Sequence, residues 1–251
     1  MKEKTNSIVA SAVTGMIAYM LTDTIHEVIG HGGTCLLIGQ HINLLTSAFF
    51  RSSPGSFITD LSGPFANLVA GLIIYNILQH RLNGSLLSSY FLLTTMAYNL
   101  FWFSGTILQS AFSSHGDWTY TLTKLHVGTM KIPILLIAGI LAYILSIKLV
   151  RNQLTRLNLH FPEIWLRKSI QYSLLFAALA AIVAALFYNP DRITAAKEGL
   201  LEMVASLPIL FTRRRNLAET KEVPMKTNWI FYSFVGLVFI GFCFTLGKGI
   251  Y

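Results

Sequence analysis

Long runs of apolar residues, separated by short polar segments, extend along almost the whole chain. A helix needs about 20 mainly apolar residues to cross a hydrocarbon core about 30 Å thick. Stretches of roughly that length with few charges occur at Ile8–Gly30, Leu61–Leu78, Leu86–Phe112, Ile132–Val150, Ile170–Phe187 and Trp229–Leu246. The pattern therefore predicts an all-α membrane protein with about six transmembrane helices.

Polar residues are distributed unevenly among these predicted spans. The first three spans contain residues such as Asp23, His26 and Asn99, whereas the last three are plainer. We therefore expect one transmembrane domain over residues 1–251, with a functional core at 8–120 and accessory helices at 121–251.

One segment of the accessory half, at about 194–212, has a different periodicity. Leu200 and Met203 fall on one helical face, and Glu198 and Glu202 fall on the opposite face. This pattern is typical of an amphipathic helix that lies on the membrane surface. A short helix packed on neighbouring loops would show the same pattern.

The composition agrees with a membrane location. Of the 251 residues, 53% are hydrophobic and only 12% are charged, compared with about 25% charged in soluble domains. The net charge of +8 comes from basic residues beside the spans, such as Lys148 and Arg167. Anionic lipid headgroups explain that placement better than nucleic acid does. We expect an integral, multi-pass protein in contact with the bilayer and with no nucleic-acid partner.

The densest group of ionisable residues lies at the end of the first predicted span. It reads Asp23-Thr24-Ile25-His26-Glu27-Val28-Ile29-Gly30-His31. Ionisable residues inside a span are costly and mark a functional site by default. In zinc hydrolases of the His-Glu-x-x-His type, two imidazoles bind the metal and the Glu carboxylate acts as the base. The alternative to a metal site is a polar helix end at the membrane interface that holds an internal ion pair.

The spacing of the two histidines has a consequence for the backbone. An i,i+5 pair in a regular α-helix points about 140° apart, so His26 and His31 cannot bind one ion from an undistorted helix. A π-bulge would bring the rings back to one face, and a helix that ends at Gly30 would turn His31 inward. We therefore predict that the chain leaves regular α-helix near Val28–His31.

Two resemblances follow from these residues. The stretch His26-Glu27-Val28-Ile29-Gly30-His31 looks like the His-Glu-x-x-Gly-His zinc motif of dipeptidyl peptidase III. More broadly, residues 8–120 resemble the site-2 protease family of intramembrane zinc proteases, which carries a His-Glu motif, a Gly-Pro-x-x-Asn motif and an Asp in three successive helices. The second motif is present here as Gly63-Pro64-Phe65-Ala66-Asn67, and the third has a counterpart in Gly116-Asp117-Trp118.

The site-2 protease resemblance implies roles for five residues. His26, His31 and Asp117 would bind zinc, Glu27 would be the general base, and Asn67 would position the substrate or the developing oxyanion. His115 and Cys35 are rival third ligands, and Asp117 is also suited to capping the segment after Gly116.

Topology supports the grouping independently of the resemblance. Three successive crossings place the end of the first span, the start of the second and the end of the third at the same membrane face. The His26 motif, Asn67 and Asp117 fall at those three places. His26 also lies about 28 Å along the helix from Ser7, close to the far boundary of the hydrocarbon core.

The sequence thus predicts a zinc-dependent hydrolase that cuts a peptide bond of a membrane-anchored polypeptide in or near the bilayer. A zinc enzyme that hydrolyses lipids or amide-linked lipids is the first alternative. The second is a metal or proton transporter that uses Asp23, His26, Glu27 and His31 as a relay.

Overall fold

The structure is a computed structural model, and it describes residues 2–80, 85–158, 163–212 and 229–251. Within those ranges it is all-α, with six helical segments long and apolar enough to cross a membrane, as the apolar runs predict. The first segment continues without a break from α1 (Lys2–Asp23) through a π-helix, η1 (Thr24–Gly33), into α2 (Thr34–Leu37). The others follow in order: α3 (Phe57–His80), α4 (Leu86–Phe112), η2 with α6 (Gly128–Met130 and Lys131–Asn158), α7 (Glu163–Ala185), and α9 with η4 (Trp229–Phe242 and Cys243–Gly247).

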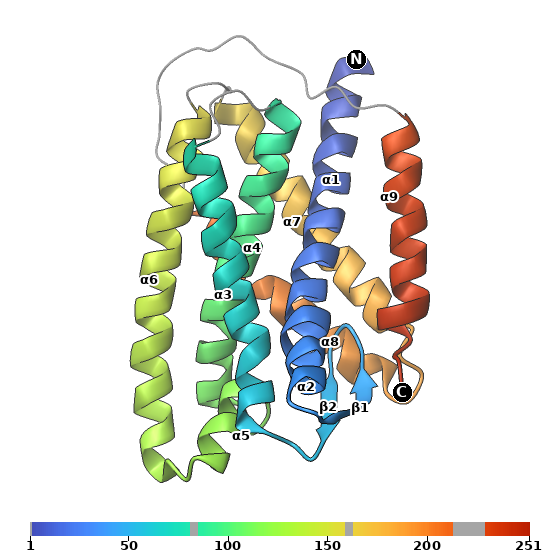
Figure 1. Cartoon of the computed structure of the whole chain (residues 1–251). Helices are drawn as coiled ribbons and strands as arrows, with labels where there is room; N and C mark the ends of the chain where they lie inside the picture. The colour runs from blue at the N-terminus through green and yellow to red at the C-terminus, as the bar shows by residue number, and fades with distance from the viewer. Residues whose placement is uncertain (1, 81–84, 159–162, 213–228) are drawn as a thin grey trace.

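The core of the bundle forms around α4, which packs against α1, α3 and α6 (Figure 1). Its buried side chains include Tyr98, Phe101 and Trp102. The bundle is also held by polar bonds between helices, which are common where the surroundings are apolar. Ser104 of α4 bonds Ser146 of α6 at 2.9 Å, and Asn99 donates to Thr22 of α1 at 3.0 Å.

Small residues let two pairs of helices approach closely. A Cβ added to Gly15 of α1 would lie 2.0 Å from the Ser173 carbonyl oxygen of α7. A Cβ added to Gly247 of η4 would lie 2.5 Å from the Ala184 carbonyl oxygen of α7. Helix α7 therefore contacts α1 along its length and η4 near its end.

A short antiparallel hairpin, which the apolar pattern does not predict, joins the first two spans. Its strands are β1 (His41–Leu45) and β2 (Phe50–Ser53). The hairpin lies at the lower end of the bundle in Figure 1, beside the C-terminus and the short helix α5 (Asp117–Lys124). Ile250 pairs with Leu45 on the outer edge of β1, so the end of the chain is joined to the hairpin.

The segment predicted at about 194–212 forms helix α8 (Arg192–Val204) and a 3₁₀ turn, η3 (Leu207–Leu210). The periodicity left open whether this helix lies on the membrane surface or packs on its neighbours. Glu198 accepts a hydrogen bond from Gln109 of α4 at 3.2 Å, and Oε2 of Glu202 is buried. Beyond α8, the Tyr143 hydroxyl of α6 donates to the Ala205 carbonyl at 2.9 Å. Both acidic residues therefore face the bundle in part, and Met203 of the apolar face is buried as well, whereas Leu200 is exposed.

Candidate metal centre

The π-helix η1 brings the two motif histidines together. The i,i+5 spacing that separates residues in an α-helix places them on one face of a π-helix. The Nε2 atoms of His26 and His31 lie 3.2 Å apart, and their rings meet edge to face. The predicted departure from α-helix is confirmed in its π-helical form. The alternative, a helix that ends at Gly30, is wrong, because the helix continues past Gly33.

A third side chain reaches these nitrogens from the end of the third span. Oδ2 of Asp117 lies 3.3 Å from Nε2 of His26, and Oδ1 lies 3.5 Å from Nε2 of His31. The two histidines are almost fully buried, and the Asp117 side chain is 22% exposed. The structure thus brings the three residues of the proposed ligand set to one point.

Glu27 belongs to the same group. His26, Glu27 and His31 are all buried, and each offers a ligand atom within 4.8 Å of the others. Oε2 of Glu27 has no hydrogen-bond partner among the described residues. A buried carboxylate oxygen without a partner is costly, so it is available to a metal, a water or a substrate.

The second span fixes the orientation of His31. Nδ1 of His31 lies 2.7 Å from the Thr59 carbonyl of α3, and that carbonyl can only accept, so Nδ1 carries the proton. In a neutral ring, Nε2 is then left with its lone pair directed at His26 and Asp117. A metal-ligating histidine usually has such a partner on its other nitrogen. No local signal in the sequence marks Thr59 for this role.

Gly63 makes room for the same ring. A Cβ at Gly63 would lie 2.3 Å from Nε2 of His31, and a Cβ at Gly30 would lie 2.6 Å from Cα of Gly63. The Gly-Pro-x-x-Asn segment therefore contributes its glycine directly to the site, because only a residue without a side chain allows α3 this close to η1. One helical turn later, Asn67 is fully buried, and neither of its amide atoms has a partner among the described residues.

Asp117 is held in place by the short helix that it begins. At the other end of α5, Lys124 bonds Oδ2 of Asp60 in α3 at 2.6 Å. Gly116 precedes Asp117 with φ of 108°, a conformation that side chains rarely adopt. Burial by itself raises the pKa of Asp117, but the facing imidazoles of His31 and His26 outweigh it and hold that pKa well below its usual range.

Two aromatic residues that belong to none of the sequence motifs border the cluster. The Phe50 ring of the hairpin stacks on His31, with centroids 5.2 Å apart, and the Trp102 ring of α4 lies edge-on to His26 at 6.1 Å. The rival ligands lie elsewhere. His115 is exposed and contacts Tyr120, and Cys35 is buried in α2 beyond the π-helix.

Comparisons with known proteins add no family. No protein-family model, no curated protein and no solved structure matches the chain. The fold and the site therefore describe an all-α, multi-pass membrane protein with a buried His-Glu-His cluster suited to a metal ion.

Proposed function

We propose that the protein is a zinc-dependent membrane hydrolase that cuts a peptide bond of a membrane-anchored polypeptide. The observation that carries the proposal is the convergence of His26, His31 and Asp117. Tetrahedral zinc with bonds of about 2.0–2.2 Å needs donor atoms about 3.3–3.6 Å apart. The two Nε2 atoms lie 3.2 Å apart. Oδ2 of Asp117 lies 3.3 Å from Nε2 of His26, and its other oxygen, Oδ1, lies 3.5 Å from Nε2 of His31, so the separations are close to that range with one carboxylate oxygen facing each ring.

The donor set also fits zinc chemically. Two imidazoles and one carboxylate, with a position left for water or substrate, make up a common catalytic zinc site. A zinc ion held there would polarise a carbonyl and lower the pKa of a water molecule to about 7. The hydrogen bond from His31 to Thr59 prepares Nε2 for this role before any ion binds.

In the proposed reaction, Glu27 moves the proton. It directly follows His26 and lies within 4.8 Å of both ring nitrogens. In the proposed reaction its carboxylate takes a proton from the water as the water oxygen bonds to the peptide carbon. It then gives a proton to the amine as the C–N bond breaks. Asn67, buried with its amide unpartnered, is our candidate to donate to the oxyanion.

The hairpin favours a peptide over a lipid as the substrate. Phe50 in β2 stacks on His31, so β2 lies directly beside the site. In the described part of the chain, β2 pairs only with β1, whereas β1 also pairs with Ile250. An extended peptide can add to such an edge through main-chain hydrogen bonds. A lipid has no backbone to pair there.

Metal content tests whether His26 and His31 bind zinc. Purified wild type should hold about one zinc per chain, and the His26→Ala/His31→Ala variant should hold none. His115→Ala is the matched control, because it removes a nearby exposed imidazole and should keep the metal. Unchanged zinc in the double variant would show that the cluster is only a hydrogen-bonded ion pair.

The Glu27→Gln variant tests whether the protein is a hydrolase in which Glu27 is the base. Gln keeps the shape and loses the basicity, so zinc should remain while cleavage of membrane-anchored peptides falls by about 10²–10⁴-fold. Glu198→Gln is the matched control on α8. Zinc-loaded Glu27→Gln with wild-type turnover would refute the base assignment. Turnover of lipids alone would identify a lipid hydrolase, and ion flux into proteoliposomes that survives Glu27→Gln would identify a transporter.

A further inference from the structure

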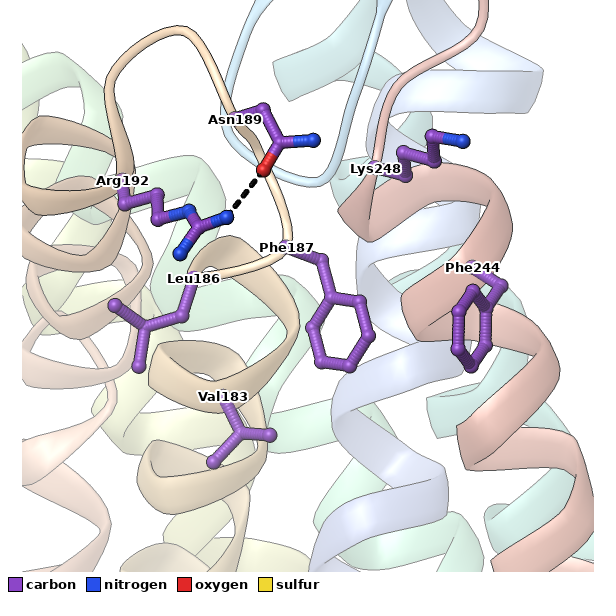
Figure 2. A pocket seen from close by; sticks show the side chains of 7 residues that line it. All are labelled: Val183, Leu186, Phe187, Asn189, Arg192, Phe244 and Lys248. Carbon is purple, nitrogen blue, oxygen red and sulfur yellow. Dashed lines mark hydrogen bonds between the residues drawn. The ribbon is translucent and has the colours of Figure 1, made fainter.

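A pocket unrelated to the metal cluster lies where the end of α7 meets η4. Its volume is about 460 Å³, and its lining includes no acidic side chain among the described residues. In Figure 2 the side chains of Asn189, Arg192 and Lys248 gather at one end, and the apolar side chains occupy the other end. The Phe187 and Phe244 rings pack edge to face across it, with centroids 5.2 Å apart. One end of the pocket is therefore cationic and the other is apolar.

The apolar end continues onto the outer surfaces of two spans. On α7, exposed side chains at helical spacing lead into it: Leu175, Leu179 and Val183. On α9 and η4, the corresponding exposed row is Leu237, Ile240 and Phe244. Both rows belong to segments that are long and apolar enough to cross the membrane, so hydrocarbon chains cover them in a bilayer.

The cationic end lies at the boundary of those spans. Arg192 lies seven residues after Ala185, the last residue of the fifth span, and Lys248 directly follows the last residue of the sixth. Arg192 donates to the amide oxygen of Asn189 (Figure 2). In the part of the chain that the structure describes, neither cation forms an ion pair. Asp191, the nearest carboxylate in sequence, accepts from the backbone N–H of Thr194 instead.

We propose that this pocket binds an anionic phospholipid. The phosphate would lie between Arg192 and Lys248, and the acyl chains would follow the exposed rows of α7 and α9. A soluble anion would leave the apolar floor uncovered. A zwitterionic lipid also carries a phosphate, but it would bring its own ammonium group beside both cations. Each basic residue near a membrane surface contributes about a fivefold preference for anionic lipid, so the pair predicts a preference of about 25-fold.

The walls of this pocket are connected to the hairpin. Tyr188 directly follows Phe187 and packs on Phe49, with ring centroids 5.5 Å apart. Two residues after Lys248, Ile250 pairs with Leu45 of β1. A bound lipid would restrain both wall segments, so we expect it to raise the thermal stability of the protein. Lipid binding at this pocket requires no catalytic activity and is independent of whether the metal centre is a hydrolase.

The test is native mass spectrometry on the full-length protein, with phosphatidylglycerol and phosphatidylcholine of identical acyl chains. Wild type should retain phosphatidylglycerol with about the 25-fold preference given above. Arg192→Gln/Lys248→Gln should lose the preference. Lys197→Gln, the matched control on α8, should keep it. The thermal midpoint of wild type should rise with phosphatidylglycerol and stay unchanged with phosphatidylcholine.

Further measurements distinguish binding of a lipid from binding of a soluble anion. Phe244→Asn should weaken retention of phosphatidylglycerol, whereas Phe234→Asn, an exposed phenylalanine earlier on α9, should not. Equal retention of the two lipids by wild type would overturn the proposal, as would an unchanged preference in the folded double variant. Displacement of the lipid by an equal concentration of glycerol phosphate would identify a site for soluble anions. If the double variant does not fold, the wild-type lipid comparison and the glycerol phosphate competition still decide.

Discussion

Gly63→Ala is the substitution that tests the metal centre most directly without touching a proposed ligand. The new Cβ would lie 2.3 Å from Nε2 of His31 and 2.7 Å from two carbons of the same ring. Ordinary contact begins at 3.4 Å, so the ring or the helix must move by about 1.1 Å. Metal–ligand distances tolerate only about 0.2 Å of error. The shift therefore exceeds the tolerance of a metal site about fivefold.

The expected result is a loss of metal affinity that exceeds the loss of stability. Overpacking of this kind destabilises a protein by about 1–3 kcal/mol. Loss of supporting contacts to a metal ligand typically lowers affinity by about 10–100-fold, and displacement of the ligand itself should reach at least the upper value. Zinc affinity measured by competition with a chromogenic chelator, beside the thermal midpoint, separates the two effects.

Gly71→Ala is the matched control on the same helix. Its Cβ would also meet a neighbour at 2.7 Å, but that neighbour is the side-chain end of Leu100, far from the histidines. The control should therefore cost some stability and keep full zinc affinity. Wild-type affinity in a folded Gly63→Ala protein would show that Nε2 of His31 does not bind the metal where the geometry places it.

Two further substitutions test residues that come from other helices. Asp117→Asn should retain the fold and weaken zinc retention, because an amide oxygen is a poorer ligand than a carboxylate, and full retention with full activity would remove Asp117 from the ligand set. Glu202→Gln should stabilise the protein at neutral pH. Burial, followed by the carboxylates of Asp23 and Glu27, raises the pKa of Glu202. A raised folded-state pKa means that stability is lost as the pH rises above the ordinary value of about 4.3. Thermal midpoints of wild type and variant should therefore diverge between pH 5 and pH 8, with the variant higher, and parallel curves would contradict this.

The amphipathic segment shows where sequence periodicity is insufficient. The spacing of Leu200, Met203, Glu198 and Glu202 predicts a helix with two faces, and the segment is helical as α8. Met203 of the apolar face and Oε2 of Glu202 on the acidic face are nevertheless both buried. Periodicity does not say which face meets the bundle. The partner of Glu198 is Gln109, a residue 89 positions earlier in the chain, and no local pattern encodes that contact.

The chain by itself determined the spans and the departure from α-helix at the motif. Apolar runs of about 20 residues must satisfy their own backbone hydrogen bonds in hydrocarbon, so they form helices. The five-residue step from His26 to His31 excludes a shared ion on an α-helix, and a π-helix is what the structure contains. Both conclusions depend on neighbours within a few residues.

Only the tertiary structure decided what completes the site. Asp117 lies 86 positions beyond His31 and faces its Nε2. Thr59 lies 28 positions beyond His31, and its carbonyl accepts a hydrogen bond from Nδ1. The position of Gly63 against the same ring depends on how closely α3 approaches η1. These contacts come from packing between helices, in which the fit of one surface on another fixes distances to a fraction of an ångström. A pattern read along one segment specifies which face is apolar, but it does not contain the shape of the surface that the face will meet.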